Sequence, residues 1–356
     1  MSATDLFVIG GGPAGLAAAI AARRRGLDVV VADAAVPPID KACGEGIMPD
    51  GLVAARALGL DLEDAGQPFR GIRFTGAGRS VKAAFPQGRG LGIRRTRLHE
   101  IMIDRATSLG VRFRWGTAIN GLDDIRARWI VAADGAHSRA RRWAGLDAGG
   151  GHPRRYGFRR HYRVARQSEF MEIHWGRTSQ LYLTPIAPGE VCVVLISRHP
   201  RPRLDDALAQ FPEAAERLRE PLTPERGALT ISRRFPAVWR GNVALIGDAS
   251  GSVDAITGEG LCLLFQQAEA LGEGLAAGDL ACYGAAHRRI GRRPQFMARF
   301  MLLLDGRDRL RASVLQAMAA RPPLFARMLA MHVGELSVLD FVKNSLALGW
   351  EMVTSL

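Results

Sequence analysis

The sequence predicts an α/β (α+β) fold, in which a parallel sheet with its helices is interrupted by an antiparallel sheet and followed by a helical C-terminus. Three observations support this prediction: a strand–helix–strand pattern over residues 5–33, period-two alternation across 156–197, and a further buried strand and long helix at 243–280. A chain of 356 residues with 47% hydrophobic side chains can bury such a core.

The first of these patterns contains a glycine-rich turn. Residues 5–10 predict a buried strand, residues 13–25 an alanine-rich helix and residues 27–33 a second strand. The turn holds Gly10, Gly12 and Gly15, with Pro13 and Ala14 opening the helix. The first glycine allows the tight bend, the second lets the backbone approach a pyrophosphate, and the third lets helix and strand pack closely. We expect a Rossmann-type unit whose helix N-terminus faces anionic oxygens.

Acidic residues follow the predicted strands. Asp33 ends the second strand, where a carboxylate can accept hydrogen bonds from ribose hydroxyls. The turn Asp134-Gly135 follows a predicted strand at 129–133, and Gly247-Asp248 follows another at 243–246. The glycine fingerprint alone fits NAD or FAD, but an NAD-dependent dehydrogenase would leave the two later turns without a purpose. These turns therefore favour FAD.

With these motifs the sequence resembles the flavoprotein superfamily typified by para-hydroxybenzoate hydroxylase, which includes geranylgeranyl reductases and flavin-dependent halogenases. The resemblance covers the chain through about residue 280. It implies that Asp134 and Gly135 lie near the FAD pyrophosphate and that Asp248 holds the ribityl chain. It also implies that Arg95 points at the cofactor. The amides at the start of the long helix would face the flavin and stabilise its anionic reduced form; they belong to Gly258, Glu259 and Gly260.

A glycine-rich segment at 41–49 contains Ala42 and Cys43. It resembles the Cys-Gly-rich segment of geranylgeranyl reductases, where a cysteine lies beside the flavin ring. Both residues are therefore candidate cofactor contacts, and Cys43 is the candidate catalytic residue. The alternative is that Cys43 is a small packed side chain.

The element pattern predicts three regions. Residues 1–150 and 235–280 form the FAD-binding domain, 151–234 an antiparallel-sheet substrate domain, and 281–356 a helical C-terminal region. Further helices are expected at 51–58, 97–109 and 204–218, and further strands at 111–115, 156–164, 170–175, 180–184, 191–197 and 228–234.

The antiparallel sheet should form the ceiling of the substrate pocket. Arg160, Tyr162 and Tyr182 are its candidate lining residues. Period-two alternation places Arg160 and Tyr162 on one face of their strand and His161 on the other, and it leaves open which face meets the flavin. We interpret His161 and His174 as structural histidines.

Three flavin reactions share these binding motifs. We expect first a monooxygenase that hydroxylates an aromatic or polyketide-like small molecule through a flavin C4a-hydroperoxide. The main alternative is a C=C reductase of the geranylgeranyl reductase type, although Gln180 and Thr184 replace two aromatics of that family's substrate motif. A halogenase is disfavoured because its Trp-x-Trp-x-Ile-Pro motif is absent. A protein that binds FAD without catalysis is a further alternative.

Composition bears on partners and location. The net charge of +13 comes almost entirely from arginine and favours anionic partners, but no nucleic-acid module is present. We expect a small-molecule substrate, apolar or carrier-bound, with electrons from NAD(P)H or a separate flavin reductase. The four cysteines lack zinc or disulfide spacing, which predicts no metal and a cytoplasmic location. No transmembrane segment is expected, and peripheral membrane contact by the C-terminal helices stays open.

Overall fold

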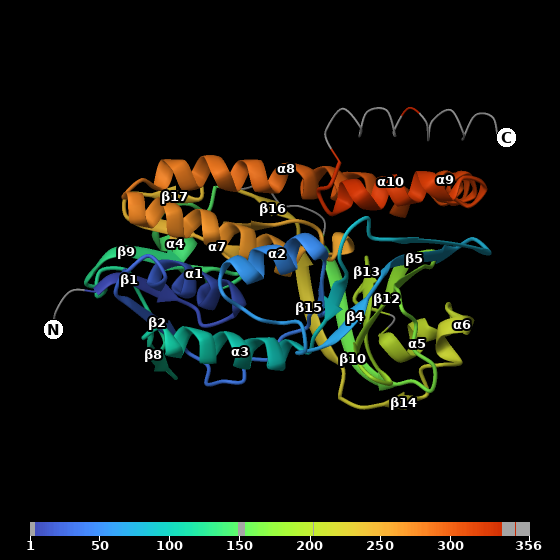
Figure 1. The fold of residues 1–356 in the computed structure, drawn as a ribbon, viewed down its shortest axis with the longest axis horizontal. Helices are drawn as coiled ribbons and strands as arrows, with labels where there is room; N and C mark the ends of the chain where they lie inside the picture. Colours follow the sequence, from blue (N-terminus) through green and yellow to red (C-terminus); the bar gives the residue numbers. More distant parts are fainter. Residues whose placement is uncertain (1–3, 149–153, 202, 337–345, 347–356) are drawn as a thin grey trace.

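The computed structural model describes residues 4–148, 154–201, 203–336 and 346. One half of the molecule contains a six-stranded sheet with its helices, and the other half contains a larger sheet of eight strands (Figure 1). The six-stranded sheet runs in the order β17 (Trp239–Arg240), β18 (Val243–Leu245), β9 (Ala127–Ala132), β1 (Thr4–Ile9), β2 (Val29–Asp33) and β8 (Arg112–Trp115). All of its pairings are parallel except that of β17 with β18.

Helices α1 (Pro13–Arg23), α3 (Arg95–Ser108) and α7 (Gly260–Ala277) pack together over this sheet, with α1 between the other two. Residues of α1 from Leu16 to Ala22 are buried because small alanines let the helix approach both neighbours. The predicted strand–helix–strand unit is therefore present.

The register of the parallel strands brings distant motifs together. Ile9 of β1 lies opposite Ala132 of β9, and Ala132 lies opposite Leu245 of β18. The residues that follow these strands leave the sheet at the same carboxyl edge, where open α/β sheets bind their ligands. The glycine-rich turn, Asp134 and Asp248 thus meet although more than a hundred residues separate them along the chain.

The eight-stranded sheet consists of β14 (Glu220–Pro221), β10 (Arg154–Arg163), β13 (Glu190–Ser197), β12 (Ser179–Ala187), β11 (Met171–Trp175), β5 (Gly71–Gly76) and β6 (Arg79–Ala84), with β15 (Arg226–Ile231) also on β10. The sequence assigned 71–84 to the first domain, whereas β5 pairs in parallel with β11 of the second sheet. A smaller sheet contains β3 (Gly46–Ile47), β7 (Gly90–Gly92) and β4 (Gln67–Phe69), near α2 (Pro49–Ala57).

Two elements differ from the prediction because of local chemistry. The single helix expected at 204–218 is two short helices, α5 (Leu204–Leu208) and α6 (Pro212–Ala215), since Pro212 has no N–H to continue the first one. The strand expected at 228–234 ends at Ile231, and Arg233–Arg234 form β16 against β19 (Gly251–Ser252).

The C-terminal helices α8 (Leu280–Asp305), α9 (Asp308–Ala320) and α10 (Pro322–His332) pack along α7 and then over β6 (Figure 1). The fold class predicted from the sequence is confirmed, including the helical C-terminal region as far as His332. The predicted helix beyond residue 336 lies outside the described residues, except for Leu346. Among the described helices, none combines the length and the apolar character that crossing a membrane requires.

Candidate functional site

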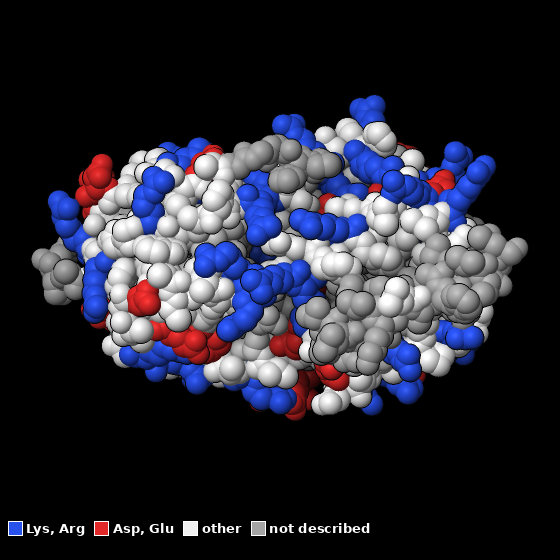
Figure 2. Space-filling view, turned by 90° about the horizontal axis from the view of Figure 1, so that it is seen from above, with Lys and Arg blue, Asp and Glu red and all other residues white. Residues whose placement is uncertain are grey.

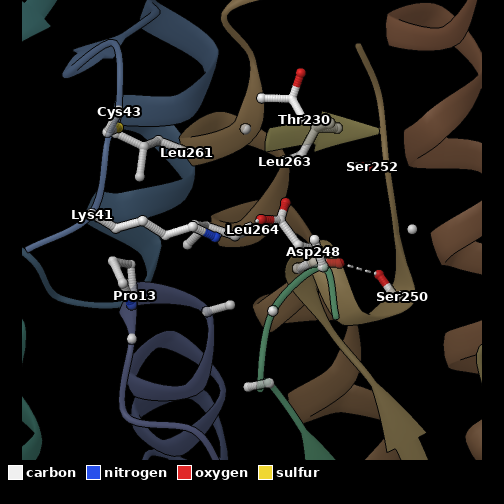
Figure 3. Close-up of a pocket in the computed structure, with 18 of the residues that line it drawn as sticks. Pro13, Lys41, Cys43, Thr230, Asp248, Ser250, Ser252, Leu261, Leu263 and Leu264 are labelled. Atoms are coloured by element: carbon white, nitrogen blue, oxygen red, sulfur yellow. Dashed lines mark hydrogen bonds and ion pairs between the residues drawn. The ribbon is translucent and has the colours of Figure 1, made fainter. Parts of the chain in front are cut away.

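The main cavity, whose lining is drawn in Figure 3, has a volume of about 690 Å³. It lies at the carboxyl edge of the six-stranded sheet, beside the eight-stranded sheet. Nearly all of the predicted cofactor residues line it: Gly10, Gly12, Pro13, Ala14, Asp33, Ala42, Cys43, Arg95, Asp134, Gly135, Gly247, Asp248, Gly258, Glu259 and Gly260. Gly15 lies behind this wall, where a Cβ would come within 1.8 Å of the Gly10 carbonyl oxygen. Its lack of a side chain therefore serves helix packing.

The glycine turn leaves room for an anion. Gly10 has a φ of +109°, and a Cβ there would lie 2.5 Å from the Ala133 carbonyl oxygen. At Gly12 the nearest atom to a Cβ would be Nη2 of Arg95, at 4.0 Å. Among the described residues, no side chain caps the N-terminus of α1 and no acid occupies its first turn, so its amides face open space. This end of the cavity fits a pyrophosphate.

Arg95 and Asp33 flank the turn. Arg95 is the first residue of α3, and its Nε is buried with no hydrogen-bond partner among the described residues. Asp33 accepts hydrogen bonds from the Gly11 amide at 2.7 Å and the Ala35 amide at 2.8 Å. These bonds fix the carboxylate at the end of β2 while lone pairs remain for hydroxyl donors.

The two later turns are held by different partners. The Asp134 carboxylate accepts from the Arg139 amide at 2.7 Å, at the start of helix α4 (Arg139–Trp143), whose N-cap is Ser138. The Gly247 amide donates to Gln267 of α7 at 3.0 Å. Asp248 follows in η1 (Gly247–Ser250) and pairs with Lys41 across the cavity at 3.4 Å (Figure 3).

The Cys43 segment is fixed by a residue that the sequence did not identify. Cys43 lies on the cavity wall beside Leu261 (Figure 3). Glu45, buried to 1% exposure, has a φ of +58°, which is unusual for a residue other than glycine. Its carboxylate accepts from the Arg95 amide at 3.1 Å and contacts Nε2 of His161 at 2.8 Å. The one sequence feature that could have pointed to Glu45 is its position between two glycines, Gly44 and Gly46.

The partner of Glu45 settles the orientation of β10. His161 faces the cofactor side of the sheet, so alternation turns Arg160 and Tyr162 to the opposite face. There Tyr162 joins a second core covered by α5 and α6, and Arg160 pairs with Asp205. The expectation that Arg160 and Tyr162 line the substrate pocket is therefore wrong.

Tyr182 does line the main cavity. Its hydroxyl donates to the Ile256 carbonyl at 2.6 Å, and burial raises its pKa well above the ordinary value. His174 lies on the far face of the sheet, where it contacts Glu172 at 3.0 Å. Hydrogen bonds from His174 and Arg217 lower the pKa of Glu172 to about 2, against the opposing effect of burial.

Three residues of metal-ligating type, Glu45, His161 and Cys192, lie within 4.8 Å of one another through one atom each. Two guanidinium groups also reach Nδ1 of His161, from Arg159 at 3.2 Å and Arg94 at 3.4 Å. Fixed positive charges so close to the trio oppose a bound cation. We interpret the trio as a hydrogen-bonded support for the Cys43 segment.

An ion-pair network supports the opposite wall. Arg155 of β10 donates to Asp254 at 3.1 Å and to Asp305 of α8 at 2.8 Å. The three side chains are at most 7% exposed. Asp254 in turn accepts from the Ile256 amide at 3.1 Å and caps η2 (Ala255–Thr257). The network therefore holds the cavity-lining segment 254–257 between sheet and helix.

Beyond that segment lies a narrow apolar chamber, with about 50 Å³ of open space. We call it the methionine chamber, because six of the ten methionines line it: Met48, Met171, Met297, Met301, Met318 and Met328. Strands β5 and β11 and helices α8, α9 and α10 supply its walls. Met171 and Thr257 line both the chamber and the main cavity, so the two spaces adjoin.

Glu259 should make stability depend on pH. Burial raises its pKa to about 8, against the opposing effect of Arg293. Between the ordinary carboxyl pKa and pH 8 the folded chain holds a proton that the unfolded chain has lost, so stability falls as pH rises. We expect Glu259→Gln to remove this contribution. Urea unfolding between pH 5 and 8 should show the wild type losing stability relative to the variant, and parallel curves would contradict the assignment.

Comparison with known proteins defines the class. Residues 3–280 match the family model described as an FAD binding domain. The chain belongs to this family and is an FAD-dependent oxidoreductase, as the sequence predicted.

Individual proteins resemble this chain at low sequence identity. A menaquinone reductase of Mycolicibacterium smegmatis is 28% identical over 322 residues, which cover 79% of this chain and 78% of that protein. A flavoprotein/dehydrogenase structure from Cytophaga hutchinsonii has a TM-score of 0.80 at 18% identity, covering 93% of this chain and 92% of that one. The p-nitrophenol 4-monooxygenase PnpA of Pseudomonas putida has a TM-score of 0.78 at 18% identity, with 94% and 99% covered. These two structures share the fold.

Proposed function

We propose that this protein is an FAD-dependent reductase that saturates a C=C bond in an isoprenoid-like chain. The observation that carries the proposal is the methionine chamber beside the main cavity. Apart from Thr257 and His332, its lining is almost wholly apolar among the described residues. Burial lowers the pKa of His332 to about 4, so this histidine is neutral at physiological pH. The chamber therefore suits a hydrocarbon chain.

The methionines explain how a narrow chamber could accept a long chain. Unbranched thioether side chains change rotamer easily and adapt to the shape of an apolar ligand. Menaquinone, the substrate in the name of the M. smegmatis relative, consists of a quinone ring with an isoprenoid chain. Hydroxylation of an aromatic ring, the reaction expected first from the sequence, stays a prediction. The chamber favours reduction because a flexible chain fits it better than a polar ring system.

Each part of the proposed site has a role. Gly12, Pro13 and Ala14 would bind the FAD pyrophosphate, and Asp33 the ribose. Asp248 would bind the ribityl chain, as the resemblance implies. Once reduced by an external donor, bound FAD would supply a hydride to one carbon of the substrate double bond, and a proton from solvent would complete the saturation at the other carbon. Tyr182 and the Arg155 network hold segment 254–257, which lines the main cavity and, through Ile256 and Thr257, the methionine chamber.

Mass spectrometry of the product tests the reaction. FAD-loaded protein is reduced with dithionite without oxygen and mixed with menaquinone. After reoxidation in air, which returns any quinol to the quinone, we expect a product that stays heavier by two hydrogen atoms, with both located in the isoprenoid chain by fragmentation. The variant Met301→Trp, which fills the chamber, should keep FAD and lose this product. A gain of one oxygen atom in aerated NADPH assays with an aromatic substrate, without any reduced menaquinone, would overturn the proposal in favour of the monooxygenase.

The variant Cys43→Ala tests the predicted catalytic thiol. We expect this substitution to slow turnover.

Asp248 offers a separate test of the cofactor position. Asp248→Ala removes the acceptor proposed for a ribityl hydroxyl, and we expect the Kd for FAD to rise about tenfold, or ~1.4 kcal/mol. Lys41→Met is the matched control, because it breaks the same ion pair and keeps the carboxylate. Fluorescence titration of the apoprotein with FAD measures the FAD affinity of both variants. Equal affinities for wild type and Asp248→Ala would show that the ribityl chain lies elsewhere.

A further inference from the structure

Four arginines line one side of the main cavity away from the glycine turn: Arg233 and Arg234 of β16, and Arg288 and Arg292 of α8. We call them the arginine rim. Figure 2 shows the α8 side of the molecule, where basic side chains gather over the middle of the surface. The sequence predicted an anionic partner from net charge alone and identified none of these residues.

Tertiary contacts place the two pairs around one opening. Ser250, at the end of η1, contacts Nε2 of His287 at 2.9 Å and so joins this segment to α8 next to Arg288. The segment continues directly into β19, which pairs with Arg233–Arg234. Arg292 lies one helical turn after Arg288 and lines the same cavity.

The rim carries uncompensated charge. Among the described residues, Arg234, Arg288 and Arg292 have no carboxylate partner within ion-pair distance. Arg233 donates only to the Ala136 carbonyl of the described chain, at 3.4 Å. The nearby Asp248 carboxylate pairs with Lys41. His287 adds no charge at physiological pH, because burial and Arg288 lower its pKa to about 4. Four arginines without a carboxylate partner among the described residues thus line one cavity.

The FAD pyrophosphate does not account for the rim. That group fits the N-terminus of α1, beside Arg95, and α7 packs between α1 and α8 (Figure 1). Guanidinium groups bind phosphate oxygens in bidentate fashion, and several of them on one rim suit a phosphate ester or diphosphate.

We propose that the arginine rim is a second anion site, which binds the phosphate groups of an organic phosphate that reaches the flavin from the α8 side. Two molecules carry this chemistry: a nicotinamide dinucleotide that delivers electrons, and an isoprenoid substrate with a phosphate-bearing head group. The electron-donor source is independent of the reaction that the flavin performs, whereas the substrate source rests on the proposed function.

Binding to the FAD-loaded protein tests the rim. The probes are inorganic pyrophosphate, NADP⁺ and geranylgeranyl diphosphate, with calorimetry and the visible flavin spectrum as readouts. We expect Arg288→Gln/Arg292→Gln to weaken pyrophosphate binding at least about tenfold. Arg289→Gln is the matched control, because Arg289 is exposed on the same helix outside the cavity lining, and it should stay within about twofold of wild type.

The other two probes distinguish the source of the phosphate. Loss of NADP⁺ binding in the double variant assigns the rim to the electron donor, and loss of geranylgeranyl diphosphate binding assigns it to the substrate head group; either supports the proposal. Equal weakening by Arg289→Gln, or wild-type affinity for all three probes in the double variant, would overturn it. Dithionite-driven menaquinone reduction needs neither probe, so its outcome reports on the proposed function separately.

Discussion

Gly12→Val is expected to abolish tight FAD binding while the fold remains intact. Gly12 has a φ of −72°, which any residue adopts, and a Cβ there meets no atom closer than 4.0 Å. The same open space is where the pyrophosphate would approach the α1 amides, so the valine methyl groups would displace it. We expect the Kd for FAD to rise about a hundredfold or more, or ~2.7 kcal/mol.

Two other glycine variants separate binding from folding. Gly15→Ala forces a Cβ to within 1.8 Å of the Gly10 carbonyl oxygen, and should destabilise the fold itself. Gly121→Val changes a position with open space around it and outside the cavity lining, and should leave both FAD affinity and stability unchanged. FAD titration and thermal unfolding of the three variants make the comparison. Full FAD affinity in folded Gly12→Val would show that the pyrophosphate lies away from this turn.

Arg155→Met is expected to cause the largest loss of stability, about 3–5 kcal/mol, because it leaves two carboxylates buried without their shared cation. Asp254 and Asp305 are 5% and 1% exposed. Hydrogen bonds from Arg198 and Arg155 hold the pKa of Asp305 below its usual value against the effect of burial. Losing Arg155 should also loosen segment 254–257 and reduce FAD affinity. Urea unfolding measures the stability.

Arg198→Met is the control for this network. Arg198 donates to the same Asp305 carboxylate at 2.8 Å, but its side chain is 37% exposed. Solvent screens the partly exposed Arg198 guanidinium, so we expect a loss of about 1 kcal/mol. Similar losses for the two arginines would mean that the burial of Arg155 contributes little.

Local motifs predicted the turns that line one end of the main cavity. The glycine turn, Asp33 and the two later turns each follow a recognisable strand, and parallel strands deliver their carboxyl ends to one edge. The sequence could not identify Glu45 as a support, because its partners His161 and the Arg95 amide are remote in sequence. The arginine rim could not be predicted for the same reason, since contacts of η1 and β19 connect β16 to α8.

The sequence by itself determined most strands of the six-stranded sheet and the turns that follow them, because backbone sterics and hydrophobic period act within a few residues. The tertiary structure alone decided which face of β10 meets the cofactor side. Alternation makes Arg160 and His161 point in opposite directions but does not say which core each face joins. Packing of α5 and α6 on one face, and of Glu45 against the other, made that choice. The methionine chamber likewise exists only where helices α8 to α10 close over the sheet.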